Sequence, residues 1–507
     1  MTQAQGLTPR DLDELHRRGM PPARIERQIE QLEAWDPWIE VERPARLGDG
    51  IISLQDFDQA ALVAAAKNAA QAGRIGAFVP ASGDATRLFE RLAQASNGGY
   101  ASLAAAEAAA HAGDQAAIEL VKIVQNLNAM AVGLALKAQG LDAASPLSAL
   151  MDALAGPGDS SLARLPKGLI PFHIENGAIR TAVAEHLLDA ASLGARQMLM
   201  TSQTQHLAKF ETAFVQQTEE TTAILHRLDL PAMTMAVQIQ NPAFDAIALN
   251  ADGELLRDDH GNLVFRPGGH GVLIHNLNAM NGDIVTIRNI DNVVTHAFKT
   301  EGHTVRQAMI GFTVNLQRAI FQAFHAIMDG AELETALAPL AGRLPWDAAT
   351  LTGDNATRRA QALNLLNRPL RVCGMVQDLD HKGGGPFWVL AEQGPSLQIV
   401  EGANLTSHDP QQAEIIGKST HFHPVDMVLG LKDPHGQPYD LTQFIDEHAV
   451  ILTAKTRNGA PIKAFEYPGL WNGSMSHWNT VFVDIPATMF NPVKYLSDLL
   501  TKYHRSN

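Results

Sequence analysis

The sequence has almost no cysteine, no long apolar run and fewer basic than acidic residues, and each shortage excludes a class of protein. Its single cysteine, Cys373, excludes an intrachain disulfide and a cysteine-rich metal site. The apolar run "LRVCGMV" around it predicts a buried, unreactive thiol rather than a nucleophile. No run approaches about 18 uninterrupted apolar residues, so we expect no membrane span.

The charge balance and the N-terminal stretch indicate which partners and which cellular location to expect. Lysine and arginine number 39 against 54 aspartates and glutamates, a formal charge of −15, and no long basic stripe is present. A nucleic-acid partner is therefore not expected. The stretch "MTQAQGLTPRDLDELHRRG" is charged and lacks the apolar core of a secretory signal. We expect a cytoplasmic protein.

The chain does have the length and composition for large cores. Its 507 residues are 46% hydrophobic and 18% charged, which predicts more than one packed region. Thr8, Pro9 and Asp11 have the features of a helix start, and Gly19 has those of a helix stop. We expect three regions: a helical N-terminal region, an α/β domain with a helical insertion at about 101–160, and a β-richer α+β region. Their predicted bounds are 1–73, 74–369 and 370–507.

Apolar strands alternate with helical patterns through the middle of the chain. The predicted strands are 75–81, 195–203, 234–240 and 283–291, with later ones near 370–376, 386–391, 396–401 and 479–485. Such alternation predicts a mixed, mainly parallel α/β sheet with right-handed crossovers. Between the third and fourth strands, Asp252-Gly253 and His260-Gly261 mark hairpin turns. Ligands of parallel sheets bind beyond the carboxyl ends of the strands, where we look for chemistry.

Two short stretches offer groups for phosphate. In "ASGDATRLF", Ser82 and Gly83 follow a strand and Arg87 lies on the first turn of the next helix, an arrangement that favours anions. A plain strand-to-helix turn fits the same residues. In "RLPKGLIPFH", Lys167 stands between a proline and a glycine and is pre-positioned. A solvated loop lysine is the alternative there.

The stretch "RPGGHGVLIHNLNAMNGDIVTIRNIDNVV" combines a glycine-rich loop with an acid after a buried strand. Gly268 and Gly269 beside His270 would let the backbone approach a flat or anionic ligand. Asp291 follows the strand, where a lone carboxylate is costly unless it is paired or holds a cation such as Mg²⁺. Asn292 would orient that carboxylate or contact a substrate. The alternative for Asp291 is a helix N-cap.

A second kind of site is suggested by "STHFHPVD". His421, His423 and Asp426 have the types and the alternate spacing of metal ligands on one strand. No further histidine is well spaced nearby, so structural or substrate-contacting histidines are favoured. A histidine–metal enzyme stays the alternative.

Taken in order, the weak signals resemble the UDP-sugar pyrophosphorylases. The matching stretches are "ASGDATRLF", "LPKGLIPF", "LMTSQTQH", "VQIQNPAF", "RPGGHGVLIHNL" and "RNIDNVV", between residues 78 and 294. The resemblance implies a Rossmann-like sheet of the nucleotide-diphospho-sugar transferase type. It also implies a nucleotidyltransferase that joins a nucleoside triphosphate, UTP, to a sugar 1-phosphate and releases pyrophosphate. Arg87, Lys167 and Asp291 would be catalytic, with Mg²⁺ on Asp291.

Binding residues are also implied by this resemblance. Ser82, Gly83, Gln240, Gly268 and Gly269 would line the nucleotide, with the Gln240 side chain reading a pyrimidine edge.

The sugar side would be lined by His270, Asn292 and Glu401, the last in "LQIVEGANL". The chain departs from the pyrophosphorylase pattern in two ways. Ser82 and Ala85 replace glycines, and about eighty mostly helical residues separate Arg87 from Lys167.

The whole chain also resembles a bacterial family that bears only a domain-of-unknown-function label. The stretches "RPGGHG", "NIDNVV", "RPLRVCGMV", "GGGPFWV" and "PGLWNGSMSHWNT" carry this second resemblance. It implies no activity. Three alternatives to the pyrophosphorylase therefore stay open: a non-catalytic nucleotide-sugar-binding protein, a glycosyltransferase of the same fold, and the histidine–metal enzyme.

Overall fold

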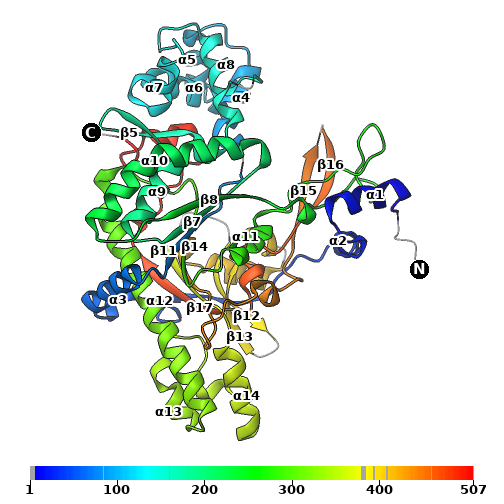
Figure 1. The fold of residues 1–507 in the computed structure, drawn as a ribbon. Helices are drawn as coiled ribbons and strands as arrows, with labels where there is room; N and C mark the ends of the chain where they lie inside the picture. Colours follow the sequence, from blue (N-terminus) through cyan, green and yellow to red (C-terminus); the bar gives the residue numbers. More distant parts are fainter. Residues whose placement is uncertain are drawn as a thin grey trace. The chain divides into compact units, whose positions relative to one another are not determined.

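The computed structural model of the chain describes residues 6–83, 85–158, 160–377, 384–391, 394–406, 409–457 and 459–505. The chain forms two compact units, and each is built from three separate stretches (Figure 1). Unit 1 comprises Met1–Phe57, Gln240–Asp283 and Thr313–Pro486, and unit 2 comprises Asp58–Ile239, Ile284–Phe312 and Ala487–Asn507. The region boundaries predicted at 73 and 370 stay predictions, because these units group the chain in a different way.

Unit 2 contributes four neighbouring strands to the main sheet, and all four are parallel. These strands, in spatial order, are β10 (Ile284–Arg288), β4 (Ile75–Val79), β7 (Gln197–Ser202) and β8 (Thr234–Ile239). Every residue of β4 and β10 is buried, as expected for central strands, although β10 includes the polar Thr286 and Arg288. The predicted strands at 75–81, 195–203, 234–240 and 283–291 are therefore confirmed, each within a few residues.

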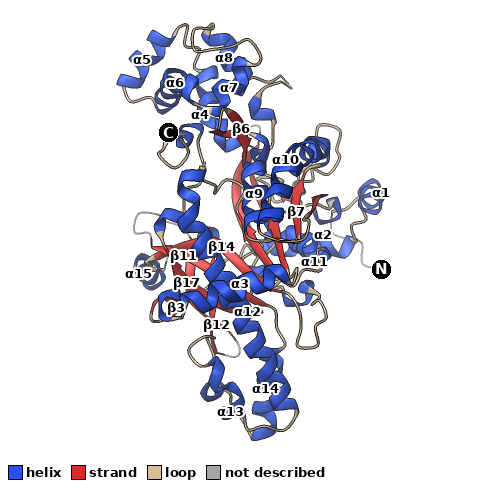
Figure 2. Ribbon diagram, turned by 60° about the vertical axis from the view of Figure 1, so that its left-hand side comes forward, coloured by secondary structure: helices blue, strands red, loops and turns tan. Residues whose placement is uncertain are grey.

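Helices pack against this sheet, and residues 103–155 are mostly helical. The helices of unit 2 are α3 (Gln59–Gln71), α4 (Thr86–Asn97), α5 (Leu103–His111), α6 (Gln115–Asn126), α7 (Ala131–Lys137), α8 (Leu147–Ala155), α9 (Ala182–Ser192), α10 (Leu207–Arg227) and the first half of α12 (Lys299–Met328). Helices α9 and α10 pack together and against strands of the sheet (Figure 2). Helix α6 contacts α5 and α4, and α4 also contacts α8. A short hairpin, β5 (Pro171–Glu175) with β6 (Ala178–Thr181), follows these helices.

Only one bent pair of helices among the described residues has the length and hydropathy of a membrane span. No single helix among the described residues is long and apolar enough to cross a membrane, and the pair Gln115–Ala129 and Ala131–Lys137 passes by length and composition alone.

Unit 1 contains a second mainly parallel set of strands and two smaller sheets. In the main set, β2 (Arg46–Leu47), β3 (Gly50–Ser53), β17 (Asn479–Ile485) and β11 (Leu370–Gln377) are parallel, and β14 (His421–Gly430) is antiparallel to β11. The smaller sheets are β1 (Val41–Pro44), β12 (Gly385–Ala391) and β13 (Gly394–Val400), and β15 (Ile451–Arg457), β16 (Ala460–Glu466) and β9 (Ala248–Leu249). The helices are α1 (Pro9–Arg18), α2 (Pro22–Ala34), α11 (Ile274–Ala279), the second half of α12, α13 (Leu333–Leu337), α14 (Asn355–Leu366) and α15 (Pro410–Gly417). The mixed, mainly parallel α/β architecture is thus confirmed.

Several local predictions in unit 1 are also confirmed. Thr8 and Asp11 form a reciprocal capping box at α1, and Gly19 ends the helix with φ +67°. Gly253 and Gly261 have positive φ at the two predicted turns, each between bridged residues. Cys373 is buried on β11, and burial raises the pKa of its thiol to about 12, so it is unreactive.

One prediction for the N-terminal region is wrong. Residues 41–53 form the strands β1, β2 and β3, where a helical region was expected. Strand β1 pairs with β12 and β3 pairs with β17, so their partners lie several hundred residues away in the sequence. Tertiary pairing of this kind leaves little signal in a short segment.

Candidate functional site

The parallel sheet of unit 2 has a point where the strand order reverses. After β4 the chain adds β7 and β8 on one side, and it then returns to place β10 on the other side of β4. The carboxyl ends of β4 and β10 are neighbours, with Ile287 paired to Phe78. In open α/β sheets such a switch point is where ligands bind. The segments that follow these two strands are therefore the first candidates for a site.

The loop after β4 is held by two neighbouring segments. The Ala81 N–H donates to Thr201 Oγ1 at 3.0 Å, and the Gln203 side-chain amide donates to the Ser82 carbonyl at 3.0 Å. The Lys167 N–H points at the Gly83 carbonyl at 3.5 Å. These contacts fix the loop that the sequence predicted to bind phosphate.

Helix α4 follows this loop and begins with a side chain that cannot cap it. Ala85 occupies the N-cap position, so no side-chain oxygen of that residue competes for the first N–H groups. The N-terminus of this twelve-residue helix favours anions. Arg87 lies on the first turn and is exposed, and Gly83 is exposed in the loop. The two polar elements predicted around "SGDATR" thus sit on one loop–helix junction.

Lys167 and Asp291 meet, although 124 residues separate them. Lys167 Nζ lies 2.7 Å from Asp291 Oδ2, and the two side chains are 15% and 20% exposed. Pro166 precedes Lys167, which begins a short 3₁₀ turn. A Cβ on Gly168 would lie 3.0 Å from Val183 Cγ2 and 3.3 Å from Ile290 Cδ1, so any larger residue would crowd the residue before Asp291. The turn and the strand end are packed together, and this places the lysine on the carboxylate.

A network of buried ion pairs contacts the carboxyl end of β10. Arg288 pairs with Asp189 at 2.6 Å and donates to the Asn292 carbonyl at 2.9 Å. Lys299 contacts both Asp189, at 2.8 Å, and Glu185, at 2.5 Å. Burial alone would raise the pKa of Asp189, but Lys299 and Arg288 hold it well below its usual range.

The side-chain amide of Asn292 is hydrogen-bonded to the chain itself. It is 3% exposed, its Oδ1 accepts the Asn491 N–H at 2.8 Å, and its Nδ2 donates to the Met489 carbonyl at 2.9 Å. The prediction of a substrate contact for Asn292 is therefore unsupported, since both ends of its amide bind the chain itself.

A magnesium ion at Asp291 would have to share that residue with Lys167. The ammonium holds Oδ2, and no group of three or more His, Cys, Asp or Glu side chains among the described residues could hold a metal. Mg²⁺ in phosphate-transfer sites takes one or two carboxylates together with water and phosphate oxygens. Asp291 fits that mode of binding, and it does not fit a site built from protein ligands alone.

The glycine-rich loop lies in unit 1 and packs against its own unit. A Cβ on Gly268 would lie 2.2 Å from the Phe244 carbonyl oxygen, and one on Gly271 would lie 2.0 Å from that of Pro468. The Gly268 carbonyl accepts the Tyr467 N–H at 2.9 Å. Close approach of the protein's own backbone therefore accounts for these glycines. The nucleotide contacts predicted for Gly268 and Gly269 stay predictions.

His270 and Glu401 come together in unit 1. His270 Nε2 lies 3.8 Å from Glu401 Oε1, and the ring lies against Trp471 with centroids 4.6 Å apart. His270 Nδ1 accepts the Leu470 N–H at 3.2 Å, so the ring proton is on Nε2 and faces the carboxylate. Burial lowers the pKa of His270, against the pull of Glu401, which favours the neutral ring.

The predicted site residues thus fall into two sets. Ser82, Gly83, Arg87, Lys167 and Asp291 belong to unit 2, and Gly268, Gly269, His270 and Glu401 belong to unit 1. Gln240 directly follows β8 and is half-buried. The convergence of both sets on one cleft stays a prediction, as does the reading of a base by Gln240.

The histidine–metal alternative finds no support. His421 Nε2 lies 3.3 Å from Asp484 Oδ1, and its Nδ1 lies 2.8 Å from Thr420 Oγ1. Both ring nitrogens are therefore occupied by the chain. The side chain of His423 lies outside the described residues.

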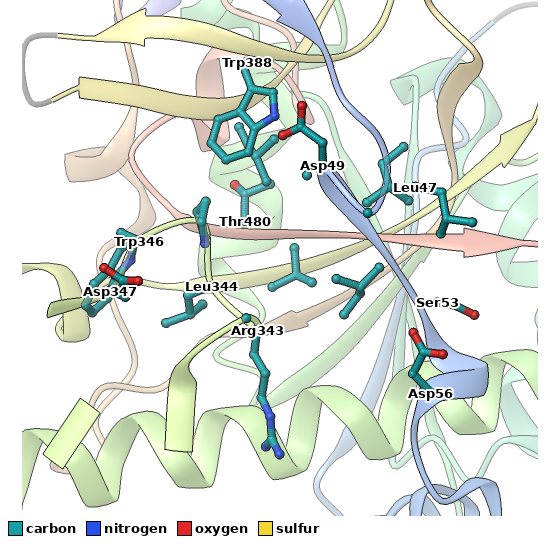
Figure 3. A pocket seen from close by; sticks show the side chains of 18 of the residues that line it. Leu47, Asp49, Ser53, Asp56, Arg343, Leu344, Trp346, Asp347, Trp388 and Thr480 are labelled. Carbon is teal, nitrogen blue, oxygen red and sulfur yellow. The ribbon is translucent and has the colours of Figure 1, made fainter. Parts of the chain in front are cut away.

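A cavity of about 770 Å³ in unit 1 does not suit a nucleotide (Figure 3). Its charged lining consists of Asp49, Asp56 and Asp347 against Arg343. An excess of carboxylates disfavours a polyphosphate. The loop and ion pair in unit 2 remain the better candidate.

Sequence reasoning missed the residues that hold the loop and the strand end. Thr201 lies near the carboxyl end of β7 and Gln203 follows the strand, in "MTSQ". Polar residues at the carboxyl end of a predicted parallel strand were a usable signal. The contacts of Asn292 with residues near 490 had no such signal.

The chain is similar to several solved structures at low sequence identity. The chain is similar to UDP-N-acetylglucosamine pyrophosphorylase of Trypanosoma brucei in complex with an inhibitor, with 12% identity, a TM-score of 0.46, and coverage of 97% of this chain and 77% of that one. It is similar to a point mutant of Leishmania major UDP-glucose pyrophosphorylase in complex with UDP-glucose, with 13% identity, a TM-score of 0.46, and coverage of 100% and 81%. A putative UDP-N-acetylglucosamine pyrophosphorylase of Entamoeba histolytica gives 10% identity, a TM-score of 0.42, and coverage of 89% and 82%.

The search of curated proteins found no match. One family model matches residues 8–505, almost the whole sequence, and its description is "Domain of unknown function (DUF4301)". This agrees with the second resemblance noted from the sequence. The chain belongs to the DUF4301 family.

Proposed function

We propose that the chain is a nucleotidyltransferase that joins UTP to a sugar 1-phosphate and releases pyrophosphate. The observation that carries the proposal is the meeting of Lys167 and Asp291 beside the Ser82–Gly83 loop, at the switch point of unit 2. Transfer between phosphates needs positioning and charge neutralisation more than a covalent intermediate. A lysine, a carboxylate and an anion-favouring helix N-terminus supply those needs. The choice of UTP and a sugar phosphate comes from the motif resemblance.

The reaction assigns a role to each charged group of unit 2. An oxygen of the sugar 1-phosphate attacks the α-phosphorus of UTP, and a new P–O bond forms. The bond from that phosphorus to the oxygen bridging the β-phosphate breaks, and its electron pair leaves with pyrophosphate. Lys167 would neutralise the α-phosphate, and Arg87 would hold the departing pyrophosphate with its planar fork.

Asp291 would hold Mg²⁺, which supplies further neutralisation of phosphate charge when bound. Gln240 would read the uracil edge. His270 and Glu401 would donate to and accept from sugar hydroxyls, because the pair presents one Nε2–H and one carboxylate. Gly268 and Gly269 would line the nucleotide beside them.

A screen for pyrophosphate release tests the proposal. Each common nucleoside triphosphate is paired with glucose 1-phosphate, N-acetylglucosamine 1-phosphate or galactose 1-phosphate in the presence of Mg²⁺, and pyrophosphate is measured. The proposal expects release that needs both substrates and is fastest with UTP. Release with no pair would contradict it. Tight UDP-sugar binding without any release would instead favour the non-catalytic alternative, and transfer from a finished UDP-sugar would favour the glycosyltransferase.

A further inference from the structure

A C-terminal segment of unit 2, residues 487–505, is bonded directly to the backbone that carries Asp291. The Val493 N–H donates to the Asp291 carbonyl at 3.1 Å. On the next residue, Asn292 accepts the Asn491 N–H and donates to the Met489 carbonyl. The strand end is therefore held from one side by a segment that is distant in sequence. The carboxylate of Asp291 points from this clamped backbone to Lys167.

His504 anchors the same segment at a second point. Its Nε2 lies 3.2 Å from the Asn491 carbonyl, and its Nδ1 lies 2.9 Å from His173 Nε2. A carbonyl only accepts, so His504 donates from Nε2. Burial lowers the pKa of His504 to about 3, so the ring is neutral and Nδ1 accepts from His173. His173 Nδ1 in turn lies 2.8 Å from Glu185 Oε1. The two imidazoles are 1% and 4% exposed, so this chain of polar contacts is buried.

These hydrogen bonds and ion pairs form a closed ring of residues. From Glu185 they continue to Lys299, then to Asp189, then to Arg288, whose guanidinium donates to the Asn292 carbonyl. Asn292 is bonded to Asn491, where the circuit began. Every member is an ionic or hydrogen-bonded group in or near the core, and partly satisfied buried networks are costly. Loss of one hydrogen bond or ion pair should therefore weaken the remaining contacts of the ring.

We propose that residues 487–505 position the catalytic carboxylate, with His504 as a positioning residue that acts through Asn491 and Asn292 on Asp291. This inference rests on the proposed function for the role of Asp291, but the clamp itself is a property of the fold. A merely structural role for His504 would lower stability and leave the Lys167–Asp291 pair unchanged. A positioning role loosens that pair.

Two variants of His504 separate these roles. His504→Phe removes the donor to Asn491 and the acceptor for His173. His504→Gln keeps a terminal donor and acceptor and should restore part of what phenylalanine loses. Phe210→Leu is the matched control, because Phe210 is fully buried in unit 2 on α10, outside the circuit.

The first measurement needs no substrate. Lysine acylation by an amine-reactive reagent is followed by mass spectrometry of the peptide that contains Lys167, with exposed Lys209 as internal reference. We expect several-fold faster labelling of Lys167 in His504→Phe, with faster hydrogen exchange at the amides of Asn491 and Val493, and neither change in Phe210→Leu. Equal labelling of Lys167 in His504→Phe, Phe210→Leu and the unaltered protein would overturn the clamp.

The second measurement uses pyrophosphate release. We expect His504→Phe to lower kcat about 10- to 100-fold at nearly constant KM, since a displaced catalytic group costs rate more than binding. His504→Gln should recover part of kcat. A change in KM alone, or equal loss in Phe210→Leu, would overturn the positioning role. If the unaltered protein releases no pyrophosphate, the proposed function fails, and the labelling result still decides the clamp.

Discussion

Replacing Gly168 by alanine should move Lys167 without removing any group from the candidate site. The new Cβ would lie 3.0 Å from Val183 Cγ2 and 3.3 and 3.4 Å from Ile290 Cδ1 and Cγ1. Gly168 does not have positive φ, so the cost comes from crowding rather than from backbone strain. Overpacking of this kind costs about 1–3 kcal/mol. In a unit of this size we expect a melting temperature lower by roughly 2–10 °C.

The effect on rate should exceed the effect on stability. If the turn shifts away from Ile290, Lys167 leaves Asp291, and misplacement of a catalytic group by about 1 Å can cost on the order of 100-fold in rate. Thermal melting and pyrophosphate release measure the two effects. Val183→Ala removes the nearest methyl, so the double variant Gly168→Ala with Val183→Ala should recover part of the rate, with Val183→Ala alone as control. A Gly168→Ala protein that keeps full activity would refute the claim that this contact sets the position of Lys167.

Three further predictions concern a buried cation, the pH dependence of stability and the histidine–metal alternative. Lys299→Met leaves two buried carboxylates without their shared cation, and breaking such pairs typically costs about 3–5 kcal/mol, so urea unfolding should show a large loss of stability. An unchanged unfolding midpoint would contradict this. Burial lowers the pKa of both His186 and His504 from 6.5 to about 3, so both are neutral in the fold and take up protons when unfolded. Stability should therefore be full above about pH 6.5 and should fall toward pH 3, by about 1.4 kcal/mol per pH unit for each histidine. Substituting both by glutamine should flatten this slope, and an equal slope in that variant would count against the assignment. Finally, His421→Ala should leave pyrophosphate release within about twofold of normal, and complete loss would revive the histidine–metal alternative.

The strands of the unit 2 sheet could be predicted because each is an apolar run that ends at a turn. Strands β4 and β10 are buried on both faces, and that burial favours the mainly apolar pattern that the sequence shows. Strands β1 and β3 could not be predicted in the same way. They are short, and their pairing with β12 and β17 depends on chain that lies more than 300 residues away.

Some residues of the candidate site could likewise be predicted from the sequence, and others could not. The ends of the predicted strands led to Asp291 and to the loop at Ser82, because parallel strands present their carboxyl ends on one edge. Lys167 contacts both segments, and their role in phosphate transfer stays a prediction. Asn292 looked like a substrate contact from its place beside an acid. Its amide is instead occupied by residues 489 and 491, and a hydrogen bond across almost 200 residues has no local pattern.

The most direct test of the account is a double-variant comparison of Lys167→Met, Asp291→Asn and both together, with kcat of pyrophosphate release as the measurement. Because the two side chains are 2.7 Å apart and would act on one transition state, each single change should lower kcat by about 10²–10³. The double variant should then lose little more than the worse single, since groups that act as a unit are not additive. Full activity in either single variant, or losses that simply multiply in the double, would contradict a single phosphate-transfer site at this ion pair.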